Sequence, residues 1–104
     1  AGQIISFEVT GHAETGPYGS DIVCAAVSAL TISTVNGIDA LAGFEPIVET
    51  NEAEGGYLYV EMSSKANQEQ TNIAQILLEN LLLGLQAVEQ ENLEFIQVKT
   101  INKK

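Results

Sequence analysis

Two residues of this 104-residue sequence, Cys24 and His12, combine chemical reactivity with a spacing that allows them to act together. Ser20 and Asp21 are residue types that commonly cap helices, so Cys24 is expected in the first turn of a helix. Backbone N–H groups and the helix dipole at such a start stabilise negative charge and favour the nucleophilic thiolate. The pattern therefore predicts a nucleophile at Cys24.

His12 lies just past the end of an expected strand, before a loop rich in glycine that leads to the helix. Folding of this loop can bring the imidazole to the sulfur of Cys24. A neutral histidine would then take the thiol proton and later return it to a leaving amine. The N–H groups of Cys24 and a neighbour are expected to hold the oxyanion.

The same residues also fit structural roles, and the sequence leaves both interpretations open. Cys24 stands among apolar residues, as a small buried side chain would, and His12 after a glycine fits a turn. Asp21 is a common cap as well as a candidate assisting residue. Ser28, one helical turn after Cys24, either bonds a backbone carbonyl or lines the site. Tyr18 either contacts a substrate or is an exposed loop residue.

Hydrophobic periodicity predicts the elements that position these residues. Alternation predicts strands over Ile4–Thr10 and Tyr57–Met62, and two further strands are expected over Phe44–Thr50 and Phe95–Ile101. Helical spacing predicts one helix from Ser20 or Asp21 to Leu41, stopped by Gly43, and another that follows the polar stretch 63–72 and ends near Glu89. This order predicts an α+β ferredoxin-like β-α-β-β-α-β two-layer sandwich, with an antiparallel sheet and two helices on one face.

The apolar positions of each element predict which faces are buried. The first strand is expected to direct Ile5, Phe7 and Val9 to one face. The first helix should bury a stripe made of Val23, Val27, Leu30, Thr34, Ile38 and Leu41. The second helix has apolar residues over more than one side, so it either lies deep in the core or contacts a second subunit.

Composition excludes several classes of function. There are 14 acidic and 4 basic residues, giving a formal charge of −10, and arginine is absent, so direct nucleic-acid binding is not expected. The acidic surface either attracts a basic protein or serves solubility alone. One cysteine and one histidine cannot build a closed zinc site or an internal disulfide. With no export signal and no membrane-spanning run recognised, we expect an intracellular, cytoplasmic domain that binds no membrane.

A longer motif surrounds the candidate nucleophile. The run Gly11-His12-Ala13, Gly16, Tyr18-Gly19 and then Asp21-Ile22-Val23-Cys24-Ala25-Ala26-Val27-Ser28 resembles the ribosomal-processing cysteine protease family, Prp. The interval from histidine to cysteine is also similar, as is Glu54-Gly55-Gly56-Tyr57 before the third strand. The local motif covers residues 11–28, and the expected order of elements over residues 4–101 is that of the family.

The resemblance implies a cysteine endopeptidase that removes a short N-terminal extension from a bacterial large-subunit ribosomal protein. It implies Cys24 as the nucleophile, His12 as the general acid/base and Asp21 as an assisting residue. A mobile loop over residues 14–20, which includes Gly16, Tyr18 and Gly19, would order around the substrate peptide, with Ser28 nearby. The resemblance also implies a homodimer and a basic ribosomal precursor as substrate, and the mechanism requires no metal or other cofactor.

We therefore expect a single cysteine-protease domain over residues 1–104. Family members usually have one more short strand before the segment that matches Ile4–Thr10, and these residues leave no room for it. Two other functions stay open. One is a non-catalytic module that binds basic proteins through its acidic face, and the other is a ribosome-assembly factor in which Cys24 is inert.

Overall fold

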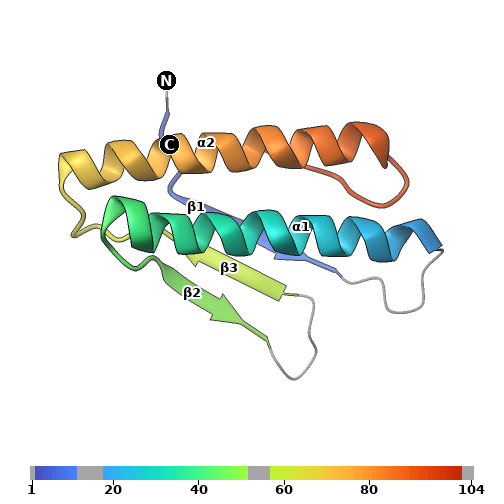
Figure 1. Cartoon of the computed structure of the whole chain (residues 1–104), viewed down its shortest axis with the longest axis horizontal. Coiled ribbons are helices and arrows are strands. Elements are labelled where there is room, and N and C mark those ends of the chain that lie inside the picture. Colours follow the sequence, from blue (N-terminus) through green and yellow to red (C-terminus); the bar gives the residue numbers. More distant parts are fainter. Residues whose placement is uncertain (1, 12–17, 52–56, 102–104) are drawn as a thin grey trace.

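The computed structural model describes residues 2–11, 18–51 and 57–101, without the side chains of residues 18–21. The elements are β1 (Ser6–Thr10), α1 (Tyr18–Gly37), the π-helical turn η1 (Ile38–Ala42), β2 (Ile47–Thr50), β3 (Tyr57–Glu61) and α2 (Gln68–Glu91). In Figure 1 the two helices lie side by side and run in opposite directions. Both cover the same face of an antiparallel sheet, which confirms the α+β two-layer prediction.

The sheet has the strand order β1-β3-β2, with the hairpin partner β3 in the centre. Val60 of β3 pairs with Phe7 of β1 and with Val48 of β2, and its side chain is 0% exposed. This face of the sheet packs against the helices, as the alternation in β3 predicts. Ile5 is 56% exposed, so its predicted place on the buried face of the first strand is wrong.

The exposure of Ile5 has its cause in the chain just before β1. The side-chain amide of Gln75, in α2, binds both main-chain groups of Ile4. Its Oε1 accepts from the Ile4 N–H at 2.8 Å, and its Nε2 donates to the Ile4 carbonyl at 2.7 Å. Ile4 packs against the core, so Ile5 faces outward.

The central core lies where the end of α1 meets the start of α2. Its buried members are Ile38, Ala42, Ala74 and Leu78, and partly buried side chains such as Phe7 pack against them. Ile38 and Leu78 are among the largest fully buried side chains. The core therefore depends on residues from both helices and the sheet.

The turn η1 changes the phase of the first helix at its end. A π-helical turn holds an additional residue, so positions after Ile38 shift around the axis. Leu41 is 65% exposed and Ala42 is 5% exposed, and the prediction that Leu41 lies on the buried stripe is wrong. Gly43 then ends the helix with φ of 83° and donates its N–H to the Ile38 carbonyl at 3.1 Å, which confirms the predicted stop.

The start of α2 is fixed by a reciprocal capping box. Asn67 accepts from the Gln70 N–H at 2.8 Å, and the Gln70 side chain accepts from the Asn67 N–H at 2.9 Å. Gln70 also donates to the carbonyl of Gly43 at 3.1 Å, so it joins the start of α2 to the end of the first helix. Farther along α2, Ile76 and Leu83 are 70% and 66% exposed.

The predicted closing strand, Phe95–Ile101, is wrong: residues 96–101 have no regular structure and Phe95 is in a turn. The chain turns directly after α2, where the Phe95 N–H donates to the Asn92 carbonyl at 2.9 Å. The Val98 N–H then donates to the Glu89 carboxylate at 2.9 Å. The Glu89 carboxylate therefore accepts a hydrogen bond from a backbone N–H that would pair with a neighbouring strand in a sheet.

One helical stretch, Ile22–Ala42, is long and apolar enough to cross a membrane by length and composition. This corrects the expectation that no such run is present. The stretch is rich in alanine, serine, threonine and isoleucine, with Asp39 near its end. Helices in the core of a folded domain meet the same criterion, and Ile38 of this stretch is a core residue.

Candidate active site

Cys24 lies in the second turn of α1, because the helix begins at Tyr18 instead of at the predicted cap. Ser20 and Asp21 are therefore inside the helix and do not cap it. The prediction that Cys24 is in the first turn is wrong by about one turn.

This shift changes which backbone groups can hold an oxyanion. In a helix that begins at Tyr18, the Cys24 N–H is part of the ladder of bonds to the carbonyl four residues earlier. The N–H groups without a helical partner belong to the first turn, at Tyr18, Gly19 and Ser20. Because helical Cα–Cβ bonds tilt toward the N-terminus, Cys24 extends toward that turn. Free N–H donors for an oxyanion are therefore expected in the first turn of α1, not at Cys24.

The side chain of Cys24 is half-buried, whereas its neighbour Val23 is 5% exposed and belongs to the core. Cys24 is therefore not the fully buried side chain that one interpretation of the sequence predicts.

The other predicted site residues divide into two groups. His12 and Gly16 lie outside the described residues, as do the side chains of Tyr18 and Asp21. Tyr18 and Gly19 form the first turn of α1, so the predicted loop over residues 14–20 is wrong for its last three positions. Ser28 is exposed and follows Cys24 by one helical turn on the same side of α1.

Two sides of α1 face different neighbours. Leu30 packs against Gly84 of α2, where an added Cβ would lie 3.3 Å from Leu30 Cδ2, and Gly37 faces Leu77. Cys24 and Ser28 lie on the side of the helix turned away from these contacts, as the periodicity of 3.6 residues requires. The thiol is therefore on the side of α1 that does not contact α2.

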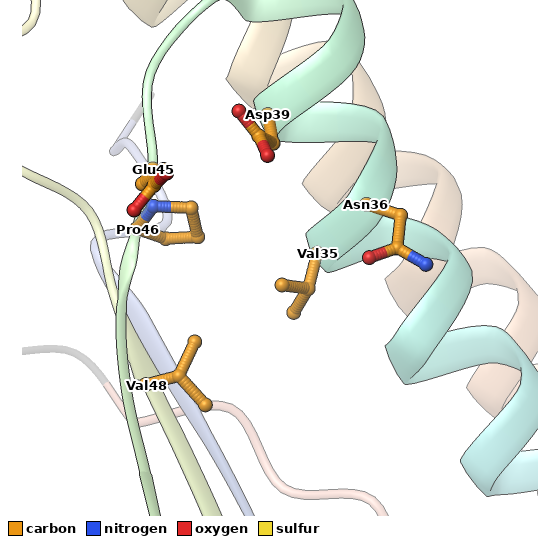
Figure 2. A pocket seen from close by; sticks show the side chains of 6 residues that line it. All are labelled: Val35, Asn36, Asp39, Glu45, Pro46 and Val48. Atoms are coloured by element: carbon orange, nitrogen blue, oxygen red, sulfur yellow. The ribbon is translucent and has the colours of Figure 1, made fainter.

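A hollow of about 370 Å³ lies on that side, between α1 and the edge strand β2. It is lined by Val35, Asn36, Asp39, Glu45, Pro46 and Val48. Figure 2 shows Val35 and Val48 directed toward each other across the hollow, with the carboxyl groups of Asp39 and Glu45 at one end.

The residues of this hollow were not among the site residues predicted from the sequence. Val35 follows Cys24 by 11 positions, a spacing that returns to the same side of an α-helix. That periodicity was available in the sequence. The strand residues that complete the hollow come from a separate element, and only the packing of β2 beside α1 brings them there.

The fold and the site define an α+β protein with a half-buried cysteine on its first helix. The chain matches the family described as Cysteine protease Prp over residues 1–97. A Bacillus subtilis (strain 168) protein named Ribosomal processing cysteine protease Prp is 39% identical over 93% of this chain and 86% of that protein. A Staphylococcus aureus (strain Mu50) protein of the same name is 34% identical over 93% and 87%. The chain belongs to the Prp family and is a cysteine protease.

Solved structures agree in fold, which is α+β and ferredoxin-like. The crystal structure of SMU.848 from Streptococcus mutans has a TM-score of 0.82 at 37% identity, over 93% of this chain and 83% of that one. The Staphylococcus aureus Prp in complex with a substrate peptide has a TM-score of 0.80 at 31% identity, over 94% and 88%. The same protease with a covalently linked product peptide has 0.75 at 34%, over 92% and 86%.

Proposed function

We propose that this chain is an endopeptidase that removes the short N-terminal extension of a bacterial large-subunit ribosomal protein. Cys24 is the nucleophile, His12 is the general acid/base and Asp21 assists. The observation that carries this proposal is that Cys24 is half-buried and lies on the side of α1 turned away from α2, in a chain that belongs to a family of cysteine proteases. The names of the relatives, which refer to ribosomal processing, support the substrate.

The choice of nucleophile rests on composition as well as position. The 104 residues contain one cysteine, and a cysteine protease needs a thiol that a peptide can reach. The same residue stands in the motif Asp21 to Ser28 that the family shares. Position, exposure and motif therefore support Cys24 together.

In the proposed reaction, the Cys24 thiolate attacks the scissile carbonyl carbon and forms a carbon–sulfur bond. N–H groups of the first turn of α1 hold the developing oxyanion. His12 donates a proton to the departing amine as the carbon–nitrogen bond breaks, leaving a thioester. Water, with His12 as base, then hydrolyses the thioester and restores the thiol.

The charge and surface of the chain support the proposed partners. A formal charge of −10 attracts a basic ribosomal precursor, and the chain carries no basic cluster for nucleic acid. The exposed Ile76 and Leu83 are two helical turns apart on α2, so they share one side and suit a homodimer contact. We propose a cytoplasmic location, where ribosomal precursors are made.

The test is cleavage of the precursor ribosomal protein followed by mass spectrometry of the product. Wild-type protein is expected to release the extension, and Cys24→Ala is expected to give no product above the enzyme-free rate. His12→Ala should lower turnover by about 10²–10⁴-fold. Ser33→Ala, an exposed position of α1, is the matched control and should retain wild-type activity.

Melting temperatures of the variants separate loss of chemistry from loss of folding. Cleavage that continues unchanged in folded Cys24→Ala would exclude the mechanism. Alkylation of the thiol distinguishes the non-catalytic alternatives, because a binding module or assembly factor keeps its activity after alkylation and a thiol protease does not.

A further inference from the structure

The thiol and the hollow beside β2 lie along one continuous side of α1. Cys24, Ser28 and Val35 are separated by four and seven residues, which places them in one stripe along α1, and Asp39 of η1 lines the same hollow as Val35. The stripe faces away from the contacts that Leu30 and Gly37 make with α2. Because Val35 and Asp39 share the hollow with Val48, the stripe borders β2 at that end.

The length of this stripe corresponds to a short extended peptide. Fifteen residues at 1.5 Å per residue separate the thiol from Asp39 by about 22 Å along the helix axis. A strand-like peptide rises by about 3.3 Å per residue, so six or seven residues span this distance.

The wall opposite α1 suits an extended occupant. In the sheet of the described residues, β2 is an edge strand that pairs with β3 alone. All four residues of β2 are exposed. An edge strand offers unpaired backbone groups to which an extended peptide can add.

The end of the stripe away from Cys24 combines apolar and acidic groups. Val35, Pro46 and Val48 contribute apolar groups to a hollow whose surface is otherwise mostly polar, and the methylene groups of a long side chain can contact them. Asp39 and Glu45 are both exposed and both line one end of the hollow, Asp39 from the helix and Glu45 from the chain just before β2, where their carboxylates favour a cationic group. A lysine or arginine side chain satisfies both parts of this surface.

We propose that the substrate lies extended between α1 and β2, and that Asp39 and Glu45 form a subsite for a lysine or arginine six or seven residues from the scissile bond. The inference rests on the proposed function, with the bond that is cleaved placed at Cys24. It adds a determinant of specificity at a distance from the reacting atoms.

The test uses synthetic peptides that span the bond found by mass spectrometry in the precursor. In the reference peptide every lysine and arginine is replaced by glutamine. A second set restores one lysine at each position up to eight residues before or after the bond. The enzymes are wild type, the double variant Asp39→Asn/Glu45→Gln, and the control Glu49→Gln, whose exposed carboxylate on β2 does not line the hollow.

Wild type is expected to cleave the peptide with lysine six or seven residues from the bond with kcat/KM about five- to tenfold above the reference. The gain should come through KM and should shrink at 1 M salt, where the screening length is about 3 Å. The double variant should lose the gain and still cleave the reference peptide normally. Glu49→Gln should keep the gain.

Two outcomes overturn the inference, and they differ in what else they affect. If wild type cleaves the reference peptide but no lysine position improves it, or if the double variant keeps the gain, the subsite is wrong and the proposed function stands. If wild type cleaves neither the precursor nor any peptide, the proposed function fails as well.

Discussion

The first helix, formed by α1 and the turn η1 that continues it, has two ends that are held differently. At the end near Gly43, Gln70 and the Asn67 capping box connect the first helix to α2, and the core residues Ile38 and Leu78 lie beside them. We call this the anchored end. At the other end, which we call the cysteine end, Cys24 is half-buried and Ser28 is exposed. The difference indicates that residues for folding and residues for chemistry are largely separate in this molecule.

The separation has a consequence for substitutions. Changes to the core and capping residues of the anchored end should lower the free energy of unfolding and leave the kcat of folded molecules unchanged. Changes at the cysteine end, such as those proposed for Cys24 and His12, should lower turnover and leave the free energy of unfolding unchanged. Because the effects of substitutions at distant sites add, the loss of stability and the loss of turnover can be measured separately in one doubly substituted chain.

The largest effect on stability is expected from Leu78→Ala. This side chain is 1% exposed at the centre of the core, so truncation leaves a cavity and should cost about 2–5 kcal/mol of unfolding free energy. Urea denaturation measures the loss, and the cleavage assay well below the melting temperature measures kcat. A lowered kcat in the folded variant would show that the two ends are coupled.

A smaller effect is expected from Asn67→Ala, which removes one of the two reciprocal bonds of the capping box directly. The loss should be about 1 kcal/mol of unfolding free energy, measured by urea denaturation. Gln90→Ala, an exposed position in the last turn of α2, is the control and should change stability by less than about 0.5 kcal/mol. Equal losses in both variants would mean that the cap does not hold the anchored end.

The smallest effect is expected on the face of the sheet away from the helices. Tyr57 donates to the Glu8 carboxylate at 3.0 Å, and this bond, with some burial and the nearby negative charge of Glu8, raises the pKa of Tyr57 above its ordinary value of 10.0. The folded state then holds the proton more tightly than the unfolded state. This contribution to stability is complete below pH 10.0 and declines as the pH rises through the folded-state pKa.

Tyr57→Phe should therefore flatten the decline in stability above pH 10.0 and leave the cleavage rate near neutral pH unchanged. Thermal unfolding at several alkaline pH values measures the slope. An identical slope in the variant would mean that the tyrosine does not contribute through ionisation.

The sequence predicted most of the fold because periodicity reports local structure directly. The stop at Gly43 and the burial of Val60 follow from turn chemistry and alternation. The errors come from tertiary effects. The π-helical turn replaced Leu41 by Ala42 in the core, and the Glu89 carboxylate bound the Val98 N–H of the expected last strand.

The candidate site, like the fold, was predicted from the sequence only in part. The sequence identified Cys24 and its motif, because reactive residue types and their spacing are visible in one dimension. It did not identify the side of α1 on which the Cys24 thiol lies. It also did not identify Val48 and Glu45 as residues that line the hollow. Those depend on which strand lies beside α1, and no local pattern encodes that choice.

The hydrogen bonds between Gln75 and Ile4 have a consequence for the dynamics of the sheet. One side-chain amide gives Ile4 both the acceptor and the donor that a neighbouring strand would supply. The chain ahead of β1 can therefore detach only when α2 moves or when this amide rotates away. Solvent exchange at the Ile4 N–H thus reports on the second helix, although the residue stands before the first strand.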